Sequence, residues 1–237
     1  KVNGTFQFTP DIITITDVTG WWANSPFTCR GEIKDYRSAE KSKIYVHVAF
    51  ENADINDLAS AFFPWKEVHG EGSVKIFIDF NCLGYQSQNL RFQGESSFKD
   101  LTLIFPAFPY PFNNTEGKIG FSSDGLTFPH IKFQTGSSDI AFSGMWKGLS
   151  KPKLKGKIKG NFVNFLDFYK PRKGEEEKPV KFTLEKITLN VKQGVYKKLV
   201  VDDLETEISS HEETFFFSSP RAARGKLRDF AFVNLNT

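Results

Sequence analysis

The chain has 237 residues, enough to bury a core as one large β domain or as two smaller units. It holds 26 phenylalanines yet has a mean hydropathy of −0.36, a combination that arises when apolar and polar residues alternate and that argues for a soluble protein. A net charge of +3 is too small to indicate nucleic-acid binding, and the sequence contains no nucleic-acid motif.

Alternation of apolar and polar residues predicts an all-β fold. The alternation is clearest over residues 44–50, 74–80 and 180–184, and clusters of Gly, Asp, Asn and Ser interrupt it at the spacing of antiparallel hairpins. Helical spacing is scarce. We expect one or two short helices, over residues 53–62 and 161–169, each stopped by a following proline.

An internal repeat gives the predicted organisation. A shift of 113 residues superposes residues 4–34 on residues 117–147 without a gap. The identical pairs are Gly4/Gly117, Phe8/Phe121, Asp11/Asp124, Thr14/Thr127, Ser25/Ser138, Gly31/Gly144 and Lys34/Lys147. Repeated hairpins stack into an elongated sheet in which each unit buries its face on its neighbours. The predicted parts of a single elongated β domain over residues 1–237 are the repeats 4–69 and 117–173, a weaker pair 70–116 and 174–237, and a charged loop at 170–179.

The two ends of the chain both have strand-like sequences. There is no initiator Met, no signal peptide and no apolar run of membrane-spanning length. We therefore expect a segment of a longer, exported protein.

Two motifs in the second repeat carry a family resemblance. They are Ser138-Asp-Ile140 followed by Gly144, and the alternating run from Pro152 to Gly160. With a looser copy in residues 4–58, these motifs resemble the AsmA-like proteins of Gram-negative envelopes. The resemblance implies a strongly curved antiparallel sheet, shaped like a folded taco, with an apolar groove that conducts phospholipid between inner and outer membranes. It also implies a periplasmic location, an inner-membrane anchor outside this chain, and other segments of the same long protein as partners.

An apolar stripe provides the candidate groove for a phospholipid or other acyl-chain ligand. Its residues are Phe6, Phe8, Ile76, Ile78, Ile119, Phe121, Phe128 and Phe133. Burial contributes roughly 0.8 kcal/mol per methylene, so such a groove would bind lipid tails without polar chemistry. The alternative interpretation is the core of an ordinary β-sandwich, filled by its own side chains.

Every second residue from Lys151 to Lys159 is a lysine, with Leu154 and Ile158 on the opposite face of the predicted strand. One interpretation is a basic ridge that faces anionic headgroups, formed by Lys153, Lys155, Lys157 and Lys159. The other is a charged outer face, or an edge strand protected against pairing with another sheet.

Two aromatic segments leave alternatives open. Residues 104–112 contain three prolines and cannot form a central strand, so they form either a lid or partner surface, or a loop packed over the end of the core. Trp21 and Trp22 either touch a membrane or sugar, or plug the sheet, and we expect them to be buried.

Catalytic and metal-binding motifs are absent from the sequence, so we expect no enzyme, no cofactor and no metal. Cys29 and Cys82 form either one disulfide or two free thiols. The expected function is a non-catalytic lipid-binding segment. The alternative is a β-sandwich adhesion or carbohydrate-binding module that uses its tryptophans, Trp21, Trp22, Trp65 or Trp146, to contact sugar.

Overall fold

The computed structural model describes residues 2–57, 69–106, 108–148, 153–170, 183–211 and 214–218. Its strands are β1 (Val2–Phe8), β2 (Ile12–Trp22), β3 (Ser25–Lys34), β4 (Lys43–Asp54), β5 (His69–Glu71), β6 (Ser73–Leu83), β7 (Arg91–Ile104), β8 (Phe112–Ser122), β9 (Gly125–Thr135), β10 (Ser138–Lys147), β11 (Lys153–Asn164), β12 (Thr183–Tyr196), β13 (Leu199–His211) and β14 (Thr214–Ser218). Two short 3₁₀ turns are η1 (Ser87–Asn89) and η2 (Phe165–Phe168).

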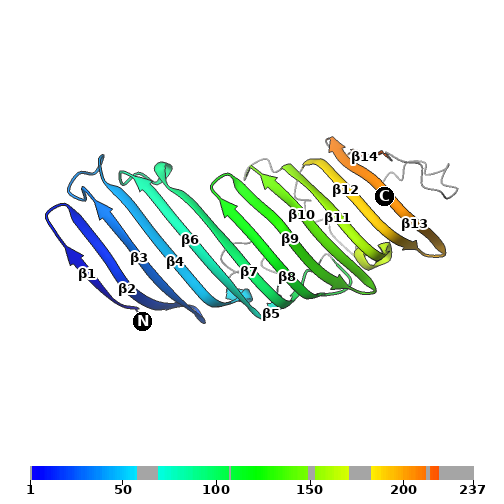
Figure 1. Ribbon diagram of the computed structural model, residues 1–237, viewed down its shortest axis with the longest axis horizontal. Coiled ribbons are helices and arrows are strands. Elements are labelled where there is room, and N and C mark those ends of the chain that lie inside the picture. The colour runs from blue at the N-terminus through cyan, green and yellow to red at the C-terminus, as the bar shows by residue number, and fades with distance from the viewer. Residues whose placement is uncertain are drawn as a thin grey trace, which may run out of the picture.

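All these strands belong to one sheet, in which neighbours in sequence are neighbours in space (Figure 1). The strands run from β1 to β14 in chain order, and the short β5 pairs with β7 on the side that β6 also occupies. Each pair is antiparallel except β11 and β12, which are parallel. The expected antiparallel sheet of hairpins is therefore confirmed, with one parallel step.

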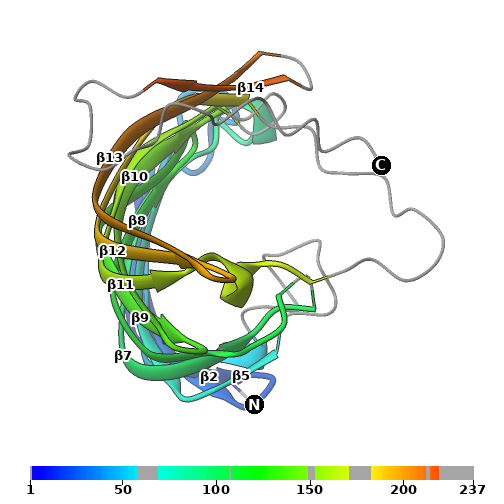
Figure 2. The same ribbon diagram turned by 90° about the vertical axis from the view of Figure 1, so that its right-hand side faces the viewer.

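Seen end-on, the sheet curls into a C that does not close (Figure 2). β-Bulges interrupt the register in β2, β7 and β8, where Asp17, Asp100 and Asn114 adopt positive φ angles near 50°. A bulge bends its strand, and Asp and Asn tolerate the left-handed conformation better than other non-glycine residues. The strands thus curve about a long open trough. Its lower rim, at the bottom of Figure 1, carries the turns at 23–24, 136–137 and 197–198.

The first repeat unit and its copy have the same strand bounds. β2 and β3, shifted by 113 residues, give the bounds of β9 and β10, and shifted β1 falls inside β8. Gly31 and Gly144 hold equivalent positions. A Cβ at either would collide with a carbonyl oxygen of the next strand, that of Tyr45 or of Lys155.

The correspondence ends after β4 and β11. β6 returns antiparallel to β4, whereas β12 runs parallel to β11 and starts at the opposite rim. The weaker pair of segments, 70–116 and 174–237, thus begins with strands that run in opposite directions. The charged loop predicted at 170–179 lies outside the described residues, except for Lys170.

The expected helices begin later in the chain than predicted. Residues 161–164 extend β11, because Val163 is needed in the core, and only the single turn η2 follows. In the other segment, residues 53–54 end β4 and residues 55–57 are helical, and the rest lies outside the described part.

Candidate functional site: the inner face of the sheet

The concave face of the sheet is identified by what packs on it. Phe165 and Phe168 of η2 pack against a cluster of buried residues, Ile140, Val163 and Val191. The short turn that follows β11 lies inside the curve of the sheet in Figure 2. The face that carries Ile140 is therefore the concave one, and we call it the inner face.

Residues paired directly across neighbouring strands share a face, so the register shows what lines the trough. One row of pairs crosses ten strands: Val18, Cys29, Val48, Ile78, Gly94, Phe121, Leu126, Trp146, Leu154 and Leu184. A second row, nearer the lower rim, crosses nine: Ala53, Val74, Phe98, Gly117, Ile131, Phe142, Ile158, Leu189 and Thr206. Neither row contains a charged residue.

The residues predicted to form a groove all lie on this inner face. Ile78 and Phe121 belong to the first row, and Ile76 and Ile119 pair in line through Ser96. Phe6 and Phe8 pair with Ile15 and Ile13 of β2, which pair in turn with inner-face positions of β3. Phe128 opposes Gly144 and packs on Phe142, with the two rings tilted and 5.4 Å between their centroids, and Phe133 opposes Ile140.

Exposure varies along this face. Phe6 and Phe8, on the edge strand β1, are 53% and 69% exposed. Ile76 and Ile78 are each only 6% exposed, because they pack in a core cluster with Phe50, Ala53, Val74 and Leu101. Ile119, Phe121, Phe128 and Phe133 are half-buried. The trough is thus filled by its own side chains over β4–β7, and again where η2 packs on Ile140, Val163 and Val191. It is more open at β1 and over β8 and β9.

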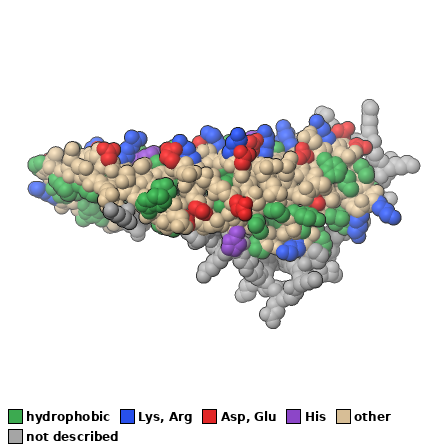
Figure 3. All heavy atoms as spheres, turned by 90° about the horizontal axis from the view of Figure 1, so that it is seen from below, with side chains coloured by type: hydrophobic (Ala, Val, Ile, Leu, Met, Phe, Trp, Pro, Cys, Tyr) green, Lys and Arg blue, Asp and Glu red, His purple; other side chains and the backbone are tan. Residues whose placement is uncertain are grey.

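The outer face has the opposite chemistry. Cross-strand ion pairs lie on it, such as Lys75–Glu51 at 2.6 Å, Lys118–Glu95 at 2.9 Å and Lys186–Glu207 at 2.5 Å. Figure 3 shows charged side chains gathered along the convex margin. A shallow hollow of about 770 Å³ on this face, over β7–β13, is lined mainly by acids, lysines and amides, with Lys132–Glu116 paired at 3.4 Å. It mixes both signs of charge and is too open to select a ligand.

A polar cluster on the same face centres on Asp79. His47 Nδ1 lies 2.7 Å from Asp79 Oδ1, and the Tyr45 hydroxyl donates to the same oxygen at 3.0 Å. The hydrogen bond with His47 lowers the pKa of the Asp79 carboxyl, and the bond to Asp79 raises the pKa of Tyr45. His47 also stacks on Phe77, whose other neighbour is the ammonium of Lys75. No third group that could act as a nucleophile appears in these bonds.

The predicted lysine ridge lies on the outer face of β11. Lys153, Lys155 and Lys159 are exposed and Lys157 is half-buried, while Leu154 and Ile158 face the trough. β11 lies between β10 and β12, so the ridge protects no edge. Lys153 is opposite Lys147 and Lys155 is opposite Met145, so within the described part of the chain these two lysines lack the acidic partners that lysines on other strands have.

The structure places the two aromatic segments, residues 104–112 and the pair Trp21 and Trp22, in different environments. Residues 105–111 contain no strand in their described part, and Phe108 and Phe112 pack with Phe168 of η2 and Phe133 of β9. This is the loop packed over the end of the core. The expectation that Trp21 and Trp22 are buried is wrong: they are 60% and 37% exposed. Alternation along β2 puts Trp22 on the inner face and Trp21 on the outer one. Trp22 packs against Phe50.

Both cysteines are free. Cys29 and Cys82 lie on the inner face, opposite Val48 and Ile44 of β4, four residues apart along that strand. Burial raises the pKa of the Cys29 thiol. The disulfide alternative is therefore wrong.

Sequence reasoning missed two sets of hydrogen bonds at the lower rim, in each of which an Asp carboxylate binds the turn before a strand; we call each set a bracket. Asp57 Oδ2 accepts from Asn24 N at 2.9 Å and from the Ser25 hydroxyl at 2.7 Å, and Asp167 Oδ2 accepts from Ser137 N and the Ser138 hydroxyl, both at 2.8 Å. The available signals were the identity of Ser25 with Ser138 in the repeat and the recurrence of Asp57 as Asp167 in the segments that follow the two copies.

No family model matches the chain, and neither a curated protein nor a solved structure matches it. Within the described ranges, no helix is both long and apolar enough to cross a bilayer.

Proposed function

We propose that the inner face holds the acyl chains of phospholipids, and that the chain is a non-catalytic segment of an AsmA-like periplasmic protein that conducts lipid between two membranes. One observation carries the proposal: the rows of paired residues that line the trough contain no charge across ten strands, while the opposite face carries ion pairs. A soluble protein gains nothing from so long a one-sided apolar surface unless something apolar covers it.

The curled single sheet also favours this proposal over a sandwich module. In a β-sandwich, a second sheet would cover the apolar face. Here the described strands form one open sheet, and its concave side is lined by residues that remain half-buried at Ile119, Phe121 and Phe128. Lipid tails would complete the burial of these side chains, at roughly 0.8 kcal/mol per methylene transferred.

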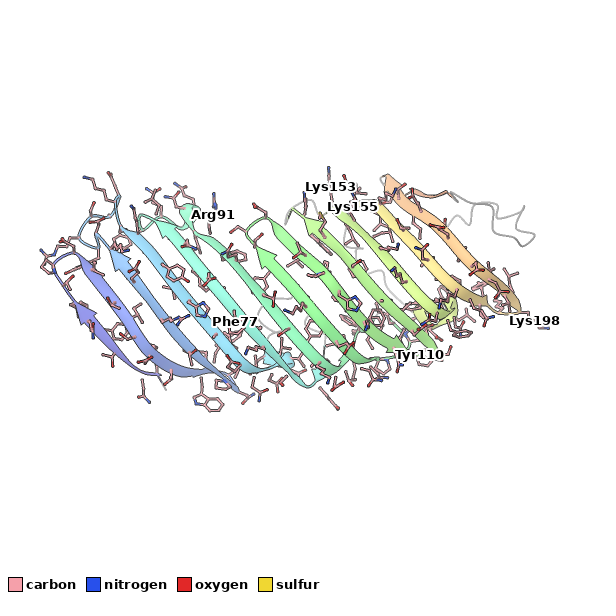
Figure 4. The ribbon with its side chains drawn as sticks, viewed as in Figure 1. Phe77, Arg91, Tyr110, Lys153, Lys155 and Lys198 are labelled. Carbon is pink, nitrogen blue, oxygen red and sulfur yellow. The ribbon has the colours of Figure 1, made fainter. Side chains whose placement is uncertain are left out.

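The role of the lysine ridge is a separate part of the proposal. Lys153 and Lys155 lie near the upper rim in Figure 4, on the face away from the trough. They would therefore attract an anionic surface from outside, rather than the headgroup of a lipid already inside.

The test is mass spectrometry of organic extracts from the purified chain and two matched variants. Phe121→Asp places a carboxylate on the inner face, and Phe77→Asp places one on the outer face, where Figure 4 shows Phe77. We expect co-purified phospholipid with the wild type and with Phe77→Asp, and a clear loss with Phe121→Asp, because a charge in the trough opposes burial of acyl chains. A wild-type extract free of lipid would refute the proposal and favour the sugar-binding alternative, in which the exposed Trp21 is the first contact.

A further inference from the structure

The lower rim differs from the rest of the surface in its exposed aromatic residues. Among the described residues, the large exposed side chains at this rim are Val2 (61%), Trp21 (60%), Trp22 (37%), Ile104 (47%), Tyr110 (48%), Tyr169 (59%), Tyr196 (46%), Leu199 (42%) and Val200 (54%). The view from below in Figure 3 shows hydrophobic side chains in groups along this rim. The aromatic ones are tryptophan and tyrosine, although phenylalanine is by far the commonest aromatic of the chain.

The tyrosines of the two rims are used differently. At the upper rim, the Tyr36 hydroxyl donates to Thr9 O at 3.2 Å, and the Tyr85 hydroxyl donates to Tyr36 O. Across the described residues, the hydroxyls of Tyr110, Tyr169 and Tyr196 make no such bond. Tyr110, Tyr169 and Tyr196 are each about half exposed.

Lysines accompany these rings. Lys197 and Lys198 form the β12–β13 turn, and the Lys197 ammonium lies 5.5 Å from the centre of the Tyr196 ring. Lys170 follows Tyr169 and donates to Pro106 O at 2.8 Å, which joins the β7–β8 connection to the segment after η2. Figure 4 shows Tyr110 and Lys198 on this same rim.

The aromatic residues are spread along the rim. They come from the ends of β2 and β12 and from the segments after β7 and η2, so they cover nine strand spacings, or about 45 Å. A folded partner would call for one compact patch, whereas a plane touches every point of a long rim at once. Trp and Tyr with flanking lysines are the residues that settle at the boundary between water and hydrocarbon in a bilayer.

We propose that the lower rim is a membrane-contact surface, at which this segment of the longer protein rests along the interface of one of the two phospholipid bilayers. Trp21, Tyr110, Tyr169 and Tyr196 insert their rings at the level of the headgroups, and Lys197 and Lys198 attract anionic lipid. This contact does not depend on what the trough carries.

Vesicle co-sedimentation tests the rim with two matched variants. The rim variant carries Trp21→Ser, Tyr110→Ser, Tyr169→Ser and Tyr196→Ser. The control carries Leu83→Ser, Tyr85→Ser and Leu90→Ser at the upper rim, where exposure is similar at 54%, 51% and 42%. We expect the wild type and the control to bind phosphatidylcholine vesicles that contain phosphatidylglycerol, and the rim variant to bind at least about tenfold more weakly.

Further arms of this experiment separate the possible outcomes. A third variant, Lys153→Gln with Lys155→Gln, tests the ridge on the outer face. If this ridge variant loses vesicle binding and the rim variant does not, the rim proposal is overturned.

The rim proposal is also overturned if the wild type binds neither neutral nor anionic vesicles. Binding of soluble poly-glutamate in place of vesicles would overturn it too, and would indicate an acidic protein partner. The lipid that co-purifies with the rim variant is measured in parallel. If the rim variant carries as much lipid as the wild type but no longer binds vesicles, the result supports the rim contact. If the wild type binds vesicles but carries no co-purified lipid, only the function proposed for the trough is refuted.

Discussion

The hydroxyl of Ser138 donates a 2.8 Å hydrogen bond to Oδ2 of Asp167, at the point where β10 begins. The same hydroxyl accepts from Asn164 N at 2.9 Å, so it joins the start of β10 to the end of β11 and to η2. Ser25 makes the equivalent bonds, to Asp57 Oδ2 and from Asp54 N. At the lower rim, each of these two sets of hydrogen bonds therefore ties the start of one strand, β3 or β10, to the segment at the end of the next strand, β4 or β11.

Removal of the Asp167 carboxylate should therefore destabilise the fold. Asp167 is 4% exposed, and in Asp167→Ala the buried Ser138 hydroxyl and the Ser137 amide lose their acceptor. We expect the free energy of unfolding to fall by about 2 to 4 kcal/mol. Urea denaturation measures this loss, with Asp124→Ala as the control, since the Asp124 side chain is exposed and makes no bond to any described residue. Equal midpoints for the two variants would contradict a structural role for the bracket.

The Asp79 cluster predicts a pH dependence of stability. The pKa of Asp79 is lowered from its ordinary value of 3.8, chiefly by the hydrogen bond with His47, so the unfolded state binds this proton more tightly than the native state does. The stabilisation is thus fully present above the ordinary pKa and is lost as the pH falls through the lower native value. In Asp79→Asn, acid denaturation curves should show a smaller decline over that range, and Asp124→Asn should follow the wild type. A steeper decline in Asp79→Asn would show that the sign is wrong.

The exposure gradient along the trough predicts different outcomes for one substitution at two positions. Ile76 is 6% exposed in a packed cluster, so Ile76→Asp buries an unpaired charge and should cost several kcal/mol, enough to abolish soluble expression. Ile119 is half-buried, so its Asp variant should fold with a modestly lowered melting temperature. Thermal melting of the two variants measures the difference. Similar behaviour would mean that the trough is equally closed at both places.

The stability of the protein should not depend on redox conditions, because its two cysteines form no disulfide. Alkylation of the denatured wild type should modify both cysteines without prior reduction, and a reductant should leave the melting temperature unchanged, because Cys29 and Cys82 are free. In the native protein, alkylation of Cys29 should be slow at neutral pH, since burial raises its pKa and less thiolate is present. Mass spectrometry that found a single species resistant to alkylation would contradict this.

Local patterns in the sequence predicted the strands and their faces. Alternation placed Ile76 and Ile78 on one face and Lys75 on the other, and the repeat placed β9 and β10 relative to β2 and β3. These predictions succeed because residues close together in the sequence determine both the pleat of a strand and the formation of a hairpin.

What the sequence could not predict depends on distant residues. Ser138 and Asp167 are 29 positions apart, and nothing in the residues between them indicates the bond. The parallel pairing of β11 with β12 has no local signal either. The helix predicted to start at Asn161 failed because tertiary burial of Val163 outweighs the local tendency. The burial expected for Trp21 failed because alternation along β2 places this side chain on the outer face.

The uncharged lining also determines how a bound amphiphile would be oriented. A headgroup carried into the trough would exchange water for a medium of low dielectric constant and find no counter-charge in either row of paired residues. Its tails, by contrast, would meet aliphatic and aromatic side chains at every strand. Any such molecule would therefore be oriented with its head at the open side and its tails against the sheet.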